Sequence, residues 1–567
     1  MMNTSTNTAF IKPFNLFIKL FLFVFLPVSV CLYTGTADAD SLQDEMQSRM
    51  TELQDTGELF IDGNKIAATH LLPAFYTQRN FTLAWNNRDK SRELINIISH
   101  IDEEGLNRDD YFLDTLAEYL KRDKQLTIAE QVDFDILQTE SLLRLGYHLR
   151  FGKVNPANLD ANWNLERKLE DEDPVYIIQA AIDSDSIQSF IDNFIPRQPF
   201  YVRYRKALAE YRDIKNLGGW PRVPDGPTLK PGMQDPRVEI LKQRLHKEGF
   251  LEGITTPADF FDYALEQAVI RFQQLHGLKD DGAVGKKTLE ELNINVVDRI
   301  NQIRVNLERG RWVFKDVQGD FLIVNIAGYK AYLVRDNKLA WTARVIIGKP
   351  YRETPTFKSE IKYLVLNPTW TIPPVILRND ILPVARTNPD YIRQRNFEVY
   401  DRQGNQVNPD SLDWSQFSGK NFPYILRQPP GPDNSLGRIK FDFENPHAVY
   451  IHDTPHRELF NQPDRSLSSG CIRIENPMQL AEILLNDRDK WGEQQLKAVV
   501  ETNKTQIVHL PRPETIMILY WTVVIEEDGA VQFTKDIYGR DQKILQALDG
   551  EFNISLPGGL PEQYYRQ

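Results

Sequence analysis

The hydrophobic pattern of this chain changes near residue 319, and that change constrains the fold more than any other feature. Before it, apolar residues recur at helical spacing, as at Leu94, Ile97, Ile98 and Ile101. After it, short β-rich runs such as Phe321 to Ile326 alternate with turn residues. The sequence therefore predicts a multidomain α+β protein, with helical domains first and a mixed, mainly β domain after them.

The chain has 567 residues, and a prior of about 150 residues per domain predicts three or four domains. Composition shifts and Pro/Gly-rich stretches set the boundaries. A segment rich in Pro, Asn, Asp and aromatic residues interrupts the strand pattern, and such insertions over β-scaffolds often act as lids. The predicted units are a signal peptide or anchor (1–39), a helical scaffold domain (40–230), a small three-helix module (232–293), a linker helix (296–318), the β domain (319–548) with an inserted cap (about 379–437), and a tail (549–567).

The N-terminus has the pattern of an export signal. Lys12 and Lys19 precede an apolar run from Leu20 to Leu32, and the small residues Ala37 and Ala39 precede a cleavage position before Asp40. The run is shorter than the roughly 18 residues expected of a spanning helix. The sequence therefore predicts a periplasmic protein whose signal is either cleaved or kept as an inner-membrane anchor. Membrane contact is expected only through this segment.

The charge of the chain excludes one class of partner. Its formal net charge is −12, and no basic block interrupts the acidic balance. Nucleic acids attract surfaces rich in Lys and Arg. No nucleic-acid partner is expected.

Outside the N-terminal segment the chain keeps a single cysteine, Cys471, 19 residues after His452. A thiol becomes a nucleophile as the thiolate, and a nearby imidazole can take its proton. His452 closes a strand, and the loop through Ser469 and Gly470 must return Cys471 to within about 3–4 Å of the ring. Gly470 lets the backbone approach closely, so that peptide N–H groups near Cys471 can bind an oxyanion. Asp453 is not expected to complete a triad, because adjacent strand residues face opposite sides.

A zinc site is the rival interpretation of this region. His447, His452 and His456 lie close in sequence, and His and Cys are zinc ligands. The odd spacing of His447 and His452 puts them on opposite faces of a regular strand, and no second cysteine is available. Neither a metal nor a cofactor is expected.

The small module resembles a known family. The residues that carry the resemblance are Val238, Leu241, Lys242, Leu245, Ala268, Val269, Phe272, Gln273, Gly277, Leu278, Asp281, Gly282, Val284, Gly285 and Thr288. Their apolar spacing and glycine positions are similar to those of the peptidoglycan-binding type 1 domain, which implies binding to cell-wall glycan.

The Cys471 region resembles the catalytic signature of the YkuD-type L,D-transpeptidase family, a histidine followed after a loop by Ser-x-Gly-Cys-x-Arg. Together with the module and the cap, it resembles the large YcbB-like branch. One departure is Ser469, where many members have histidine, so a second imidazole cannot assist. The resemblance rests on residues 450–454 and 468–473, and extends to residues 348–350, 354–356, 367–370 and 437–441.

The resemblance implies a two-step acyl transfer. Cys471 attacks the carbonyl of meso-diaminopimelate in a tetrapeptide stem and expels D-alanine, and an amine of a second stem then forms a 3→3 cross-link. His452 acts as base and then acid. Arg473 is expected to orient the loop or hold a donor carboxylate, with an exposed salt bridge as the plain alternative. Substrate-groove roles are predicted for Tyr450, Trp370 and Arg427, although Tyr450 and Trp370 are equally consistent with core positions.

The resemblance also implies partners and an inhibitor class. The expected partners are peptidoglycan stem peptides and glycan, with other wall synthases alongside, in a role in cell-wall organisation and cell shape. Carbapenems are expected to acylate Cys471. Two other functions stay open, an L,D-carboxypeptidase that uses water as acceptor and a non-catalytic peptidoglycan-binding scaffold. A papain-like protease is disfavoured because its local cysteine signature is absent.

Overall fold

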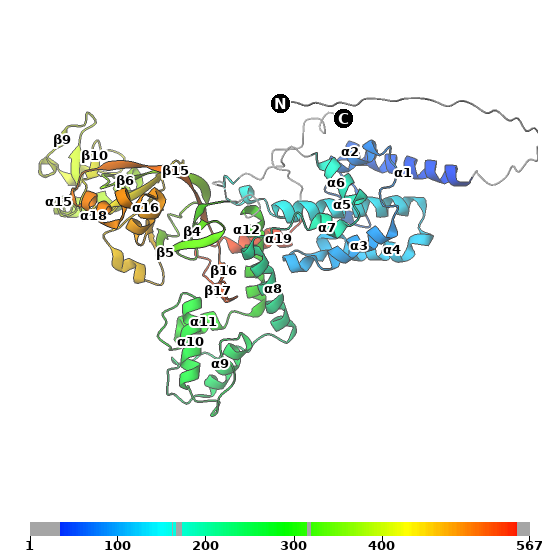
Figure 1. Ribbon diagram of the computed structural model, residues 1–567, viewed down its shortest axis with the longest axis horizontal. Coiled ribbons are helices and arrows are strands. Elements are labelled where there is room, and N and C mark those ends of the chain that lie inside the picture. Colours follow the sequence, from blue (N-terminus) through cyan, green and yellow to red (C-terminus); the bar gives the residue numbers. More distant parts are fainter. Residues whose placement is uncertain (1–33, 161–162, 166–172, 314–318, 553–567) are drawn as a thin grey trace, which may run out of the picture.

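The computed structural model describes residues 34–160, 163–165, 173–313 and 319–552. A helical region, a small helical module and a β-rich region follow one another along the chain, and the long helix α12 (Val296–Val313) lies where the three meet (Figure 1). The predicted multidomain α+β fold is confirmed. The predicted signal segment up to residue 33 and the tail from residue 553 lie outside the described residues. Among the helices in the described ranges, none combines the length and apolar character needed to span a membrane.

The helical region is built around α5, whose residues are buried on almost every side. Thr127 and Glu130 form a capping box that starts this helix. The helical spacing from Leu94 to Ile101 corresponds to α3, which ends at Ser99, before Ile101. Ile101 instead begins a short 3₁₀ turn that Gly105 closes. The elements are α1 (Thr34–Thr56), β1 (Phe60–Ile61), β2 (Asn64–Lys65), α2 (Leu71–Gln78), α3 (Arg88–Ser99), α4 (Leu113–Arg122), α5 (Ile128–Phe151), α6 (Pro174–Asp183), α7 (Ile187–Ile191) and α8 (Pro199–Asn216).

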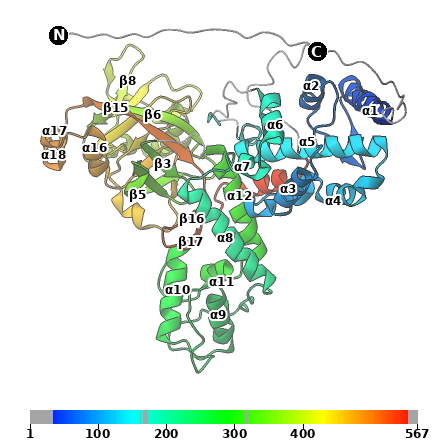
Figure 2. The same cartoon turned by 45° about the vertical axis from the view of Figure 1, so that its right-hand side comes forward.

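The small module consists of α9 (Pro236–Lys247), α10 (Tyr263–Leu275) and α11 (Lys286–Leu292). Asp235 and Asp262 cap the first two helices through their side chains. The apolar faces expected from the sequence meet in its core, where Val238, Leu241, Leu245, Ala268, Val269 and Phe272 are all buried. The module extends away from the other two regions beside α12 (Figure 2).

A nine-stranded sheet forms the β-rich region, in the order β13-β5-β14-β12-β11-β6-β15-β3-β4. An additional pairing of β4 with β5 closes the sheet on itself, which removes most of its free edges. The strands are β3 (Phe321–Asn325), β4 (Lys330–Arg335), β5 (Lys338–Gly348), β6 (Phe357–Leu366), β11 (Ile439–Phe443), β12 (Ile451–His452), β13 (Ser466–Ser468), β14 (Ile472–Ile474) and β15 (Gln506–Leu519); α16 (Pro477–Leu485), α17 (Arg488–Trp491) and α18 (Glu493–Glu501) join them.

A cap with its own small sheet is inserted between β6 and β11. Its hydrophobic core is separate from that of the closed sheet and includes Trp370, Trp414 and Leu436. The separately packed segment thus begins at Trp370, before the predicted start at residue 379. Its elements are β7 (Trp370–Thr371), α13 (Pro374–Ile376), α14 (Leu382–Thr387), α15 (Asp390–Gln394), β8 (Glu398–Tyr400), β9 (Gln406–Val407) and β10 (Ile425–Gln428).

After β15 the chain leaves the sheet and returns to the helical region. The hairpin of β16 (Val523–Ile525) and β17 (Val531–Phe533) and the helix α19 (Asp541–Asp549) share a hydrophobic core with the N-terminal helices. Arg309 on α12 binds Asp541 at 2.6 Å. Residues 523–548, predicted as part of the β domain, therefore complete the helical core and join the two regions.

Candidate active site

Two short parallel strands at the centre of the sheet carry the predicted nucleophile and base. In β12 and β14, Ile451 pairs with Ile472 and His452 with Arg473. Tyr450 accepts a hydrogen bond from the Ile472 N–H, which extends this register to Cys471. Since residues two apart on a strand share a face, Cys471 and His452 lie on the same face of the paired strands, offset by two positions.

The turn that carries Cys471 is held by three hydrogen bonds. The Ser468 hydroxyl donates to the Cys471 carbonyl at 2.5 Å and accepts the Gly470 N–H at 3.1 Å. The Thr354 hydroxyl donates to the Gly470 carbonyl at 2.8 Å. Gly470 has φ +114°, which only glycine adopts readily.

These hydrogen bonds show which N–H group near Cys471 is free to bind an oxyanion. The Gly470 N–H is already donated to Ser468, so it is not free for an oxyanion. The Cys471 N–H has no hydrogen-bond partner within the described part of the chain. We therefore assign the free donor to the backbone of Cys471 itself.

The surroundings of the Cys471 sulfur keep it protonated at neutral pH. Its Sγ lies 3.8 Å from the Ala448 carbonyl oxygen. Burial raises the pKa of the thiol above its usual range, and hydrogen bonds from the Tyr450 backbone and hydroxyl offset this only partly. Lys440 and Arg473 also favour the thiolate through their charges. Burial is the larger effect, so the resting nucleophile is a thiol. The two positive charges act in the opposite direction and make its ionisation less unfavourable.

His452 is also neutral at rest. Its ring is buried, with 4% of the residue exposed, and its Nδ1 lies 2.5 Å from the carbonyl oxygen of Asp453. Because a carbonyl oxygen can only accept, Nδ1 carries the proton, and Nε2 presents a lone pair. Burial lowers the pKa of His452 to about 3, and the charge of Arg473 acts in the same direction, whereas hydrogen bonds to the backbone of Asp453 and Leu436 oppose it. In the described structure no hydrogen bond joins the ring to Cys471.

Asp453 contributes its backbone rather than its carboxylate. The carboxylate accepts the Arg438 N–H at 2.8 Å and lies 3.4 Å from Arg457, whereas the carbonyl oxygen holds the His452 ring. The sequence argument against a triad role for this carboxylate is consistent with that geometry. The carbonyl contact was not predicted, because no side-chain pattern marks it.

The predicted groove residues take different positions. Tyr450 hydrogen-bonds Cys471 and Trp370, and burial raises its pKa above the usual range. Arg473 is close enough to Cys471 and to Arg395 of the cap for their charges to affect its pKa, which burial lowers. Arg427 pairs with Thr371, so it faces the opposite side of the cap sheet from Trp370, and it packs over Tyr400 at 4.9 Å. Its role in substrate binding stays a prediction.

Ser469 has a partner that the sequence did not indicate. Arg352 donates to the Ser469 hydroxyl at 2.8 Å and to the two carboxylate oxygens of Asp380 at 2.5 and 3.1 Å. Asp380 belongs to the cap, so Arg352 links the cap to the turn that carries Cys471. Residues 348–350 and 354–356 contributed to the family resemblance, but Arg352 lies between them and was not part of it, so only its neighbours offered a signal for this link.

We expect Arg352→Gln to loosen the cap and to raise KM about three- to tenfold with a smaller change in kcat, because the bidentate ion pair is lost while the turn that carries Cys471 keeps its other hydrogen bonds. Steady-state kinetics on a peptidoglycan tetrapeptide would measure this. Arg393→Gln is the matched control, since Arg393 pairs with Asp390 and Asp410 on the cap surface. Equal kinetic constants for the two variants would show that the link has no role in substrate capture.

The three neighbouring histidines do not form a common cluster. His447 packs beside Phe357 at 5.2 Å, and His456 lies 3.4 Å from Glu458. Within the described residues, no group of three or more His, Cys, Asp or Glu side chains could hold a metal ion.

The raised thiol pKa predicts slow alkylation at neutral pH. In a Cys31→Ser background, the rate of iodoacetamide labelling at Cys471 should rise roughly tenfold per pH unit and level off only above pH 9, since only the thiolate reacts. When the same protein is unfolded in urea, the labelling rate should level off near pH 8.5, because the ordinary pKa of a thiol is about 8.5. Intact-mass kinetics would measure both. Half-maximal labelling of the folded protein below pH 8 would contradict the neutral resting thiol.

Comparisons with known proteins agree with this geometry. Residues 319–506 match the L,D-transpeptidase catalytic domain, residues 234–292 match a family described as "Putative peptidoglycan binding domain", and residues 70–208 match the Scaffold domain. A Haemophilus influenzae protein named "Putative L,D-transpeptidase" is 38% identical over 257 residues, which cover 45% of this chain and 50% of that protein. The chain thus spans about half the length of this curated relative.

Two solved structures are similar at low identity. A Xylanimonas cellulosilytica L,D-transpeptidase is 14% identical, with 52% of this chain and 99% of that chain covered and a TM-score of 0.18. A Stackebrandtia nassauensis L,D-transpeptidase is 13% identical, with 52% and 97% covered and a TM-score of 0.20. Similarities at these TM-scores do not bear on the fold.

The sheet and the Cys471 turn therefore belong to an L,D-transpeptidase catalytic domain of the YkuD type. The same chain carries a peptidoglycan-binding domain, so the predicted combination of the two families is confirmed.

Proposed function

We propose that this protein is a periplasmic L,D-transpeptidase that forms 3→3 cross-links between peptidoglycan stem peptides through a thioester on Cys471. One observation carries the proposal: Cys471 has a free backbone N–H and shares a strand face with a neutral, buried imidazole. The family of the catalytic domain supports the same chemistry.

The first step transfers an acyl group to sulfur. As the Cys471 sulfur attacks the carbonyl carbon of diaminopimelate, the thiol proton passes to Nε2 of His452, and the Cys471 N–H binds the developing oxyanion. Collapse of the tetrahedral intermediate breaks the peptide bond, and the imidazolium returns its proton to the leaving amine of D-alanine. One thioester forms and one amide breaks.

The second step returns the enzyme to its resting state. The side-chain amine of an acceptor stem attacks the thioester carbonyl, and His452 takes a proton from that amine. Collapse forms the new amide, and the proton passes to the departing sulfur of Cys471. Because both groups are neutral at rest, each transfer needs the imidazole only as a temporary proton carrier.

Positive charge near the sulfur supports the proposal. Lys440 lies over the Tyr450 ring at 4.3 Å, and Arg473 extends from the position beside His452. Both charges favour the thiolate over the thiol. They are also suited to hold a carboxylate of the donor stem, whose termini are anionic. We assign to Arg473 the binding of this donor carboxylate.

Incubation of the purified protein with disaccharide-tetrapeptides, followed by mass spectrometry, tests the proposal. Dimers that lack one D-alanine are the expected product. Tripeptide monomers alone would identify an L,D-carboxypeptidase, and retained binding to sacculi without product would identify a non-catalytic scaffold. A carbapenem should add its mass at Cys471 of the active protein, and an unmodified active protein would contradict the acyl-enzyme.

A further inference from the structure

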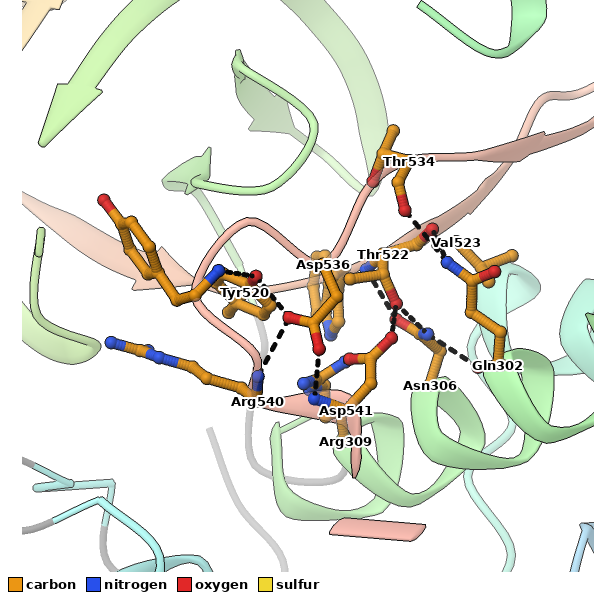
Figure 3. A network of polar contacts seen from close by, with 12 residues as sticks. Gln302, Asn306, Arg309, Tyr520, Thr522, Val523, Thr534, Asp536, Arg540 and Asp541 are labelled. Atoms are coloured by element: carbon orange, nitrogen blue, oxygen red, sulfur yellow. Dashed lines mark hydrogen bonds and ion pairs between the residues drawn. The ribbon is translucent and has the colours of Figure 1, made fainter. Parts of the chain in front are cut away.

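A cavity of about 210 Å³ lies between the helical region and the catalytic sheet, away from Cys471. Five aromatic side chains and one arginine account for much of its wall: Trp163, Trp312, Tyr520, Trp521, Tyr538 and Arg309. They come from the helical region, from α12 and from the segment that follows β15. Figure 3 shows Arg309, Tyr520 and Arg540 around the polar network of Asp536 and Asp541.

One buried donor in this wall lacks a partner. Arg309 is 4% exposed, and its Nη1 donates to Asp541. Its Nη2 is buried and has no hydrogen-bond partner among the described residues. A buried guanidinium N–H without an acceptor is unfavourable, and a ligand oxygen would satisfy it once the side chain of Arg309, which lines the cavity, turns toward the ligand.

The rest of the wall suits a ring with one apolar face and a polar edge. Tyr520 lies between two guanidinium groups, 5.1 Å from Arg309 and 5.0 Å from Arg540. Asp160 and Glu353 are the acidic groups of the lining, and Arg540 pairs with both of them. Enclosed aromatic surface with a few polar groups is the usual composition of a small-molecule site.

We propose that this cavity is a second peptidoglycan-binding site, which takes one N-acetylhexosamine of the glycan strand. The pyranose ring packs on the aromatic side chains, its hydroxyls meet Asp160 and Glu353, and the acetamido carbonyl accepts the free N–H of Arg309. The inference rests on the proposed function, because that function supplies the glycan to which the stem peptides are attached.

Hydrogen bonds connect this cavity to the Cys471 turn. The hydroxyl of Tyr538 donates to the Gly348 carbonyl at 2.6 Å and accepts the Thr354 N–H at 3.2 Å. The Thr354 hydroxyl in turn donates to the Gly470 carbonyl at 2.8 Å. A sugar that packs against Tyr538 therefore contacts a residue that is hydrogen-bonded to the groups that position Cys471. Binding of the sugar at this place aligns the glycan with the peptide being processed.

Calorimetric titration of the full chain with tri-N-acetylchitotriose tests the site. Leu159→Trp fills the cavity from its half-buried rim and should weaken one class of binding at least about tenfold. Leu217→Trp, at a residue that is 76% exposed, is the matched control and should bind as the unaltered protein does. The unaltered protein and the two variants share the module of α9 to α11, so any sugar binding by that module contributes equally to all three titrations.

A second pair of measurements tests the acetamido contact. Arg309→Lys keeps the charge beside Asp541 but removes Nη2, so it should lose the preference for tri-N-acetylchitotriose over its deacetylated counterpart. Equal binding by Leu159→Trp and Leu217→Trp, or no preference for the acetylated sugar in the unaltered protein, would overturn the proposal. Cys471→Ala should bind the sugar normally, so a failure of the sugar site and a failure of the transpeptidase assignment give different results.

Discussion

Cys471→Ala is expected to lower cross-link formation by a factor on the order of 10⁴ or more, the largest effect of any single substitution in this chain. The sulfur is the atom that carries the acyl group between the two steps, and no other thiol is present in the described residues. Mass spectrometry of the products from disaccharide-tetrapeptides measures the loss. Tripeptide products should disappear with the dimers, since both come from one thioester.

The fold should survive this change. Cys471 is only partly buried; its sulfur makes a long contact with the Ala448 carbonyl and accepts hydrogen bonds from Tyr450, none of which holds the turn together. The backbone hydrogen bonds of the turn come from Ser468 and Thr354 and do not involve the sulfur. The Tm of Cys471→Ala should therefore stay within a few degrees of the unaltered value. Cross-linked product from this variant at the unaltered rate would remove Cys471 from the mechanism.

Local sequence patterns predicted the helical module and the strand that presents His452. The spacing of Val238, Leu241 and Leu245 marks one face of a helix, and that face is buried in the structure. His452 follows an apolar run and ends a strand, as its pattern predicts. These features depend on neighbours within a few residues, which is why the sequence alone reveals them.

Features that depend on distant pairs could not be predicted in the same way. The Arg352–Asp380 pair and the contact of Thr354 with Gly470 join segments 28 and 116 residues apart. The return of α19 to the helical core likewise depends on Arg309 and Lys153, which bind Asp541 and the Leu548 carbonyl. No periodicity encodes such pairings, because each is fixed only when the tertiary packing forms.

Which N–H group near Cys471 is free could not be predicted from the sequence, for a related reason. Ser468 precedes the cysteine by three residues, a spacing at which a hydroxyl can accept a backbone N–H within a turn. It does so with Gly470, and that bond leaves the Cys471 N–H as the free donor. The motif therefore indicated the turn and its N–H groups near Cys471, and the structure shows which of these groups is free.

His452→Gln is expected to lower kcat/KM by about 10² to 10⁴, the usual contribution of a positioned general base. Glutamine has nearly the size of the ring, but it cannot take the thiol proton. The dependence of activity on pH in the His452→Gln variant should separate the role of His452 as a base from a structural role. Above the raised pKa of Cys471, solvent removes the proton without help, so the activity of the variant should rise about tenfold per pH unit up to that value.

The unaltered protein should behave differently over the same range. Because the pKa of His452 is about 3, the imidazole stays neutral from pH 8 down to pH 5, and its protonation should not lower the rate there. His509→Gln is the matched control, since His509 is exposed on β15 and packs beside Tyr363. If the activity of His452→Gln depends on pH in the same way as that of His509→Gln, the His452 ring has only a structural role in the site. A steep rise confined to His452→Gln would identify the imidazole as the group that removes the thiol proton.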